Sequence, residues 1–248
     1  MVYRTSMSAE LEHEQIKLPV IPGKPNLGWD LDSVIVSLRI PEQKYIGTPL
    51  GFDVHGSPSR TIYDYSQKPE IRERDAFPFV LECFKNPQFY REAEPIWPII
   101  RLIKILHNRG YMQSIITARY KEELQDVTFE KLREYGLGWI IPDVHFVEFN
   151  HGQRGEQKKL IATRLGLHVY TDDHGPTVLG MTTPTLMAKM VFEYPWNKER
   201  DENGKYIYDD RFTYRVKSAR TIAKVIQRVS RAHFLHYAVP LDPLHVAQ

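Results

Sequence analysis

Residues 27–38, LGWDLDSVIVSL, decide the fold of this chain. The stretch is short, apolar and rich in β-branched residues, a pattern typical of a buried strand. Two aspartates, Asp30 and Asp32, interrupt it, and the apolar pattern does not explain them. Residues two apart in an extended strand share one face, so both carboxylates are expected to point the same way. Two like charges this close are costly unless a cation or a shared proton separates them.

Helices and strands alternate along the rest of the chain. Helical spacing of apolar residues and a closing glycine predict helices at 95–110, 121–136 and 155–166. Further strands are predicted at 111–119, 143–149, 167–173 and 188–194, and residues 214–233 end in a terminal helix. This order predicts an α/β fold, a doubly wound (Rossmann-like) parallel sheet with helices on both faces.

Residues 41–95 differ from the rest, since they are rich in Tyr, Phe, Pro and Arg and lack a long clean period. We expect a small helical cap here, inserted after the first strand, with a helix at 69–84 and a loop at 87–95. The expected organisation is an N-terminal arm at 1–25, a core of 26–40 and 96–230, the cap at 41–95, and a C-terminal tail at 231–248.

Composition limits the function classes. The chain has 248 residues, 42% of them apolar, and its formal net charge is +2, which excludes a mainly electrostatic nucleic-acid binder. A single cysteine, Cys83, excludes an internal disulfide framework and a thiolate zinc cluster, and we expect it to be a small core residue. There is no secretory signal and no apolar run of about 18 residues, so we expect a cytoplasmic protein that does not enter a membrane.

Polar side chains follow the predicted strands at the edge where such sheets bind ligands. Thr117 lies in the second strand, Asp172 and Asp173 end the fourth, and a lysine pair, Lys158 and Lys159, lies in the helix before it. Carboxylate oxygens of this kind suit Mg²⁺. Together these groups supply the nucleophile, the general acid and the charge clamp that phosphoryl transfer requires. Taken singly, each has an ordinary alternative, namely a solvated turn for the aspartates and a solvated helix face for the lysines.

The four elements, in this order, resemble the motifs of the haloacid dehalogenase superfamily of phosphohydrolases. Asp-x-Asp-x-Val at 30–34, Thr117, the lysine and Asp-Asp at 172–173 carry the resemblance, which covers roughly residues 26–230. A narrower resemblance is to the 5′(3′)-deoxyribonucleotidase branch. It rests on the room for a small cap, on residues 89–106 as the return to the core, and on residues 190–226 as the last strand, loop and helix. One departure is Ser33, where many members have glycine.

The resemblance implies a role for each motif residue. Asp30 would be the nucleophile, and Asp32 the acid and base that serves the leaving group and then water. Mg²⁺ would be held by Asp30, by the carbonyl of Asp32 and by Asp172, with Asp173 as a second ligand or an orienting group. Thr117 would bind a phosphate oxygen. Lys158, preferred to Lys159 for its spacing from Gly166, would neutralise the phosphoryl group.

The substrate is less constrained than the chemistry. Phe52, Tyr63 and Tyr65 lie in the expected cap, where relatives stack a pyrimidine base, and Arg119 could reach a phosphate or the substrate. Packing within the cap is the alternative for these aromatic residues. The preferred function is a Mg²⁺-dependent phosphomonoesterase acting on nucleoside 5′-monophosphates. The alternatives are a 3′-phosphatase of nucleic-acid ends and a non-catalytic binding or scaffold protein, and a homo-oligomer is left open.

Overall fold

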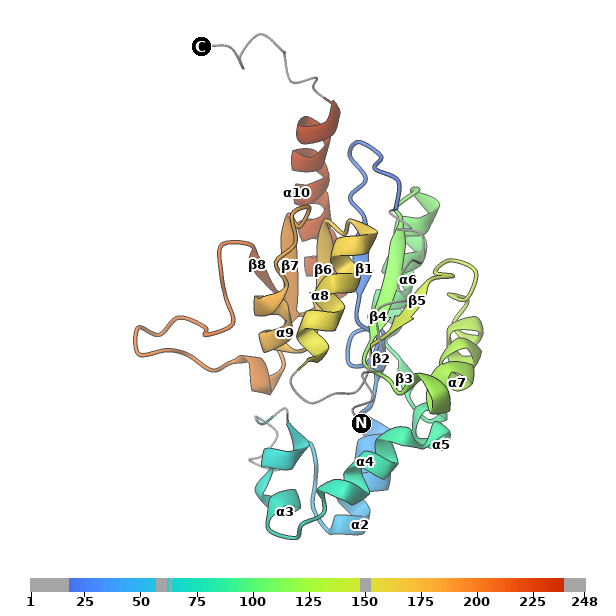
Figure 1. Ribbon diagram of the computed structural model, residues 1–248, viewed down its shortest axis with the longest axis vertical. Coiled ribbons are helices and arrows are strands. Elements are labelled where there is room, and N and C mark those ends of the chain that lie inside the picture. The colour runs from blue at the N-terminus through green and yellow to red at the C-terminus, as the bar shows by residue number, and fades with distance from the viewer. Residues whose placement is uncertain (1–17, 57–61, 63, 148–152, 239–248) are drawn as a thin grey trace, which may run out of the picture.

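The computed structural model describes residues 18–56, 62, 64–147 and 153–238. Six parallel strands form the main sheet in the order β5-β4-β1-β6-β7-β8 (Figure 1). Their bounds are β1 Leu27–Trp29, β4 Gln113–Thr117, β5 Val144–Phe146, β6 Val169–Asp172, β7 Ala188–Phe192 and β8 Thr213–Val216. The sheet grows from β1 outward in both directions, which confirms the predicted doubly wound α/β fold.

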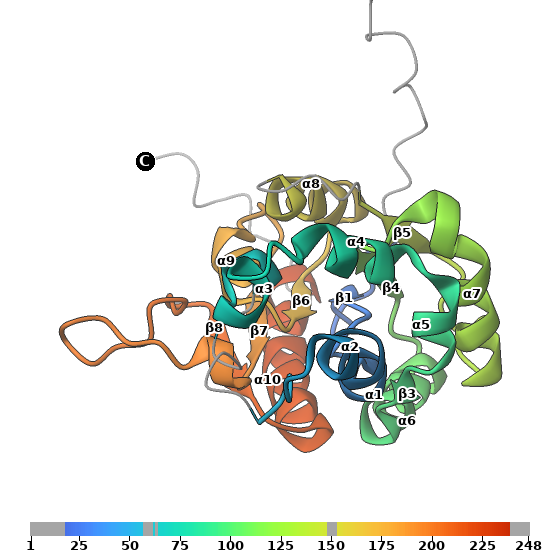
Figure 2. The ribbon, with the colours of Figure 1, turned by 90° about the horizontal axis from the view of Figure 1, so that it is seen from below.

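Helices cover both faces of this sheet. Figure 2 shows α8 (Arg154–Leu165) and α9 (Gly175–Gly180) on one face, and α6 (Trp97–Asn108) and α10 (Ala219–Ala238) on the other. A further helix, α7 (Lys121–Glu134), follows β4. Leu27 and Trp29 share one face of β1 and are fully buried in one apolar cluster, whereas Gly28 between them faces Leu167 and Tyr170 of a second apolar cluster. No helix in the described part of the chain is long and apolar enough to cross a bilayer.

Residues between the first strand and α6 form an excursion beyond one end of the sheet (Figure 1). The chain leaves through β2 (Val36–Ser37) and returns through β3 (Glu94–Pro95), and these two strands pair antiparallel. The segments between them are α1 Arg39–Glu42, a π-helix at Gln43–Gly47, α2 Thr48–Leu50, a 3₁₀ turn at Tyr65–Gln67, α3 Pro69–Arg72, α4 Phe77–Lys85 and α5 Pro87–Arg91. The two paired strands therefore fix where the excursion leaves and rejoins the core.

The helices that were predicted from a closing glycine are present. Gly110, Gly136 and Gly166 follow α6, α7 and α8 with φ of 80°, 68° and 62°, the left-handed conformation that glycine adopts without strain. Two short elements, β8 and α9, were not predicted as separate elements, because four to six residues show too little of a period.

Three local predictions were wrong. The first strand ends at Trp29, and Asp30 to Ile35 form a turn, with Ser33 at φ 60°. The helix predicted at 69–84 is two helices, α3 and α4, separated by a turn in which Asp75 has φ 50°. The loop predicted at 87–95 contains α5 and β3, because Asn86 caps a helix that begins with Pro87 by accepting a bond from the Gln88 N–H at 2.9 Å.

Candidate active site

Three buried carboxylates meet at the carboxyl end of the sheet. Asp30 follows β1, Asp172 ends β6 and Asp173 follows it, and β1 and β6 are neighbours in the sheet. One oxygen from each of the three lies within 4.8 Å of the others. We call Asp30, Asp172 and Asp173 the carboxylate cluster. The parallel pairing of the two strands brings together residues 142 positions apart.

Lys158 joins the members of this cluster. Its Nζ donates to Asp30 Oδ1 and to Asp172 Oδ2, both at 2.8 Å. The lysine side chain is only 6% exposed, although it lies on the second turn of α8. Lys159 instead faces outward and lies 3.6 Å from Glu156 on the same helix. The structure thus brings Lys158, and not Lys159, to the carboxylates.

Asp172 is held on both oxygens. Oδ2 also accepts from the Tyr170 hydroxyl at 2.8 Å, and Oδ1 accepts from the His174 backbone N–H at 2.8 Å. Sequence reasoning missed Tyr170, although it lies two residues before Asp172 and therefore shares its face of β6. The carboxylate of Asp172 is consequently fixed in orientation before any ligand binds.

Asp32 is engaged by Arg119 rather than by lysine. Arg119 Nη2 lies 2.6 Å from Asp32 Oδ1, and Nε lies 3.0 Å from Oδ2, so the pair is bidentate. The guanidinium, 3% exposed, also donates to Thr128 Oγ1 at 3.0 Å and lies 4.2 Å from the centre of the Tyr90 ring. Among the described residues, these contacts of Arg119 orient Asp32, and the contact of Arg119 with a phosphate or the substrate stays a prediction. The Asp32 side chain is 23% exposed, the most open of the four carboxylates.

The turn after β1 explains the serine at position 33. Its backbone N–H donates to Val36 O at 2.7 Å, and its carbonyl accepts from the Tyr194 hydroxyl at 2.8 Å. Ser33 has a φ of 60°, the left-handed conformation that glycine adopts without strain, at the position where many members of the resembled superfamily have glycine. The serine therefore preserves the turn that presents Asp32.

Thr117 ends β4 next to β1, as predicted. Its hydroxyl is fully buried and has no hydrogen-bond partner among the described residues. A buried hydroxyl without a partner costs free energy, so it is a group that a bound ligand could satisfy.

Residues 196 and 197, in the loop after β7, hold the backbone of Asp173 in place. The fully buried Asn197 donates through Nδ2 to Asp173 O at 2.6 Å and to Phe192 O at 2.8 Å, and its Oδ1 accepts from Gly175 N at 2.9 Å. Trp196 Nε1 donates to the same Asp173 carbonyl at 2.9 Å. Neither role was predicted, because a loop asparagine carries no signal until its neighbours in space are known.

The pKa values of the carboxylate cluster bear on whether a cation fits there. Burial, reinforced by the charges of Asp172 and Asp32 and opposed by Lys158, raises the pKa of Asp30 to about 7. Burial, followed by the charges of Asp172 and Asp30, raises the pKa of Asp173 well above its usual range. Burial also acts to raise the pKa of Asp172, but Lys158 outweighs it and the pKa is lowered.

Two cationic side chains, Lys158 and Arg119, thus face four carboxylates. This surplus of negative charge, on hard oxygen donors, suits a divalent cation such as Mg²⁺. The residues that could hold it are Asp30, Asp172 and Asp173.

The aromatic residues proposed for the substrate pack within the excursion. Phe52 and Tyr65 are partly buried against the apolar core, and the Tyr65 ring meets Phe84 edge to face at 5.4 Å. Tyr63 lies outside the described residues. Burial raises the pKa of Glu42 to about 7, opposed by a hydrogen bond from Tyr65 and the charge of Lys68, with the charge of Asp32 adding to the rise. Glu42 therefore lies within electrostatic range of the site, a position that the sequence did not indicate.

Solved structures of haloacid dehalogenase-like hydrolases share this fold. One is a haloacid dehalogenase-like hydrolase from Streptococcus pneumoniae. The similarity covers 83% of the present chain and 100% of the Streptococcus protein, with a TM-score of 0.55 and 16% sequence identity. Another is a subfamily IA hydrolase of the same superfamily from Geobacter sulfurreducens. The similarity covers 83% of the present chain and 97% of the Geobacter protein, with a TM-score of 0.55 and 12% sequence identity.

A third solved structure is of a protein from Lactobacillus delbrueckii that carries the name of a phosphoglycolate phosphatase. The similarity covers 82% of the present chain and 98% of the Lactobacillus protein, with a TM-score of 0.53 and 16% sequence identity. No protein-family model matches the chain, and no curated protein does so either. At these identities the similarity establishes the fold, and the arguments about function rest on the site.

Proposed function

We propose that this protein is a metal-dependent phosphomonoesterase in which Asp30 is the nucleophile. The observation that carries the proposal is the bridge of Lys158 between Asp30 and Asp172, in which a buried ammonium contacts two buried carboxylates at the carboxyl end of the sheet, where such sheets bind ligands. The shared fold with haloacid dehalogenase-like hydrolases, and the order of the motifs, support the same chemistry.

The reaction has two steps. An oxygen of Asp30 attacks phosphorus, the ester P–O bond breaks, and Asp32 gives a proton to the departing alkoxide. Water then attacks the aspartyl-phosphate, Asp32 accepts the water proton, and inorganic phosphate leaves with Asp30 restored. Arg119 holds Asp32 through two nitrogens and so fixes the orientation of its carboxylate. The partnerless hydroxyl of Thr117 would donate to a phosphoryl oxygen.

Mg²⁺ is the cation that we expect, held by the carboxylate cluster and, as the resemblance implies, by the carbonyl of Asp32. When bound, it would neutralise charge on the phosphoryl oxygens. Lys158 supplies a second positive charge from the protein and favours the ionised form of Asp30.

For the substrate we prefer a nucleoside 5′-monophosphate, because the sequence resembles the 5′(3′)-deoxyribonucleotidase branch and residues 41–95 form an excursion between β1 and α6 at this end of the sheet. The name of the Lactobacillus protein favours a second candidate, a small phosphorylated carboxylic acid such as phosphoglycolate. A 3′-phosphate on a nucleic-acid end is a third. The intact set of carboxylates, lysine and threonine argues against a purely non-catalytic binding role.

Phosphate release from a panel of nucleoside monophosphates, phosphoglycolate and a 3′-phosphorylated oligonucleotide would test this proposal. We expect release with Mg²⁺, none with EDTA, and a loss of at least a thousandfold in Asp30→Asn. Lys158→Met should lose activity, whereas Lys159→Met, a change on the adjacent outward-facing residue, should not. The rank of the substrates chooses among the three candidates. If folded wild-type protein releases phosphate from none of them with Mg²⁺ present, the proposed phosphatase function on these substrates is wrong.

A further inference from the structure

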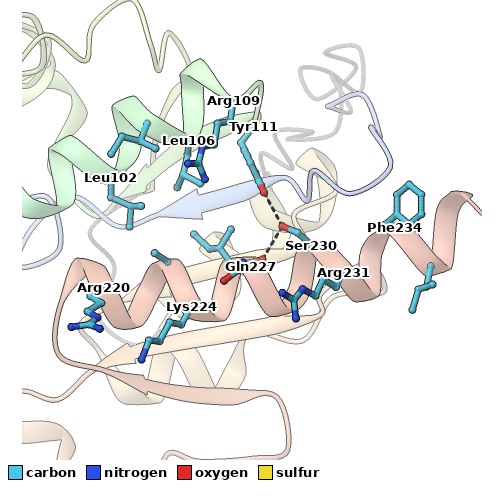
Figure 3. A pocket seen from close by; sticks show the side chains of 14 residues that line it. Leu102, Leu106, Arg109, Tyr111, Arg220, Lys224, Gln227, Ser230, Arg231 and Phe234 are labelled. Atoms are coloured by element: carbon cyan, nitrogen blue, oxygen red, sulfur yellow. Dashed lines mark hydrogen bonds between the residues drawn. The ribbon is translucent and has the colours of Figure 1, made fainter.

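A groove lies between α6 and α10, and none of the residues of the carboxylate cluster lines it (Figure 3). Its volume is about 740 Å³, and its floor is apolar, formed by residues such as Leu102, Leu106 and Ile226. One hydrogen bond crosses it, between the hydroxyls of Tyr111 and Ser230 at 2.9 Å. At one end, the adjacent apolar side chains of Phe234 and Leu235 are 52% and 64% exposed. The groove is therefore an apolar surface that lacks a cover among the described residues.

The rim of this groove is positively charged. Arg109 comes from the end of α6, and Arg220, Lys224 and Arg231 lie along one side of α10. None of the residues lining the groove is acidic, and α10 contains no aspartate or glutamate from end to end. None of the four cations has an ion-pair partner among the residues that the structure describes. An occupant with both carboxylates and apolar groups fits such a surface, whereas a nucleic acid would not need the exposed Phe234 and Leu235.

We propose that the acidic stretch of this chain around Glu10, Glu12 and Glu14 docks in the groove between α6 and α10. The sequence there is AELEHEQI at 9–16, with glutamates at every second position and no lysine or arginine between them. In an extended chain these carboxylates would share one side at intervals of about 6.6 Å. The rise of a helix places Arg220 and Lys224 about 6 Å apart, and Arg220 and Arg231 about 16 Å apart. The two patterns are opposite in charge, and the interval between successive glutamates is close to the interval between Arg220 and Lys224.

The chain connection allows this docking. The structure describes the chain from Leu18, whose N–H donates to Leu165 O at 3.4 Å, and Gly23 already lies against the Phe234 ring at the end of the groove. An extended chain spans roughly 3.3 Å a residue, so Glu14 to Glu10 can lie about 13–26 Å from Leu18. The α10 face from Phe234 back to Arg220 is about 21 Å long. Glu10 to Glu14 span about 13 Å of extended chain, enough to lie along the part of α10 between Arg231 and Lys224, which are about 10 Å apart.

Disulfide trapping in the full-length chain tests the docking. One variant carries cysteines at His13 and Gln227, the latter an exposed position in the middle of the groove. The matched control carries them at His13 and Arg164, an exposed position on α8 next to Leu165. Because Leu18 is bonded to Leu165, a tethered chain without docking would favour the control pair. Single-cysteine variants report any contribution from the buried Cys83.

We expect the Gln227 pair to close at least ten times faster than the Arg164 pair, as an internal bond whose rate does not depend on protein concentration. Adding Lys224→Glu and Arg231→Glu, or 1 M NaCl, should remove most of that advantage, because the attraction is electrostatic. Equal or slower closure of the Gln227 pair would overturn the proposal, and so would closure that ignores the charge reversals. Disulfide-linked dimers in place of the internal bond would overturn the proposal as well. They would indicate that a second copy of this chain occupies the groove.

Discussion

Replacing Lys158 by methionine should destabilise the protein in a way that depends on pH. The change keeps most of the side-chain volume and removes the one ammonium that contacts both Asp30 and Asp172 at 2.8 Å. All three groups are buried, with side-chain exposures of 6%, 8% and 1%. Removing one partner of a buried ion pair costs about 3–5 kcal/mol, because the remaining charge stays uncompensated. We therefore expect a loss of about 3–5 kcal/mol in the free energy of unfolding at pH 8.

The sign of the pH effect follows from the carboxylates. Without Lys158, the pKa of Asp30, already raised to about 7 by burial, must rise further, and the pKa of Asp172 loses the attraction that lowers it. A carboxyl whose folded pKa exceeds its unfolded pKa loses stability as the pH rises through the folded value. The penalty of Lys158→Met should consequently be largest at pH 8 and shrink toward pH 5, where protons neutralise the cluster.

Urea unfolding in EDTA at pH 5, 6, 7 and 8 measures this penalty, with Lys159→Met as the matched control. Lys159 lies on the same helix, one residue on, and contacts only Glu156 among the described carboxylates at 3.6 Å. The control should stay within about 0.5 kcal/mol of the wild type at every pH. A Lys158→Met penalty equal to that of the control at pH 8, or one that does not change with pH, would refute the charge balance described for the cluster.

Three further changes test the surroundings of the site by urea unfolding and, for the last, by activity. Ser33→Gly should stabilise the protein by up to about 1 kcal/mol, because glycine tolerates the observed φ of 60° better than serine; a clear loss would contradict the strain. Glu42→Gln should stabilise it by up to about 3 kcal/mol at pH 8 and by little at pH 4.5. The reason is that the fold favours the neutral form of Glu42, whose pKa is raised from 4.5 to about 7. An equal gain in the free energy of unfolding at both pH values would refute this reasoning. Asn197→Ala should cost about 2–4 kcal/mol and reduce phosphate release, because three buried hydrogen bonds around Asp173 are lost, whereas Asn203→Ala in an exposed turn should change neither.

The elements that were predicted well are those with a strong local signal. The apolar period of 95–110 with Gly110 after it defines a helix within one stretch of sequence, and so does 155–166 with Gly166. The alternation of such helices with short apolar strands then leaves few topologies, and the doubly wound sheet is one of them. The residues at the strand ends, Asp30, Asp172 and Thr117, could be placed near one another by that topology alone.

The details that were missed depend on partners distant in the chain. Arg119 meets Asp32 across 87 residues, and Asn197 meets Asp173 across 24, so no local pattern contains either contact. The interior of 41–95 was also poorly predicted, because its helices are short and begin at prolines, such as Pro69 and Pro87, without a full apolar period. Lys158 was preferred to Lys159 for its spacing from Gly166, and in the structure Lys158 is the one of the two that contacts the carboxylate cluster.

The most direct test of the account is to trap phosphate on Asp30. The protein would be mixed with Mg²⁺ and the best substrate of the panel, quenched in acid within one turnover, and analysed by peptide mass spectrometry. We predict a phosphoryl group, about 80 Da, on the peptide that contains Asp30, absent in Asp30→Asn and in samples with EDTA. Phosphate release by the wild type without any adduct, together with full activity in Asp30→Asn, would contradict the central claim that this aspartate is the nucleophile.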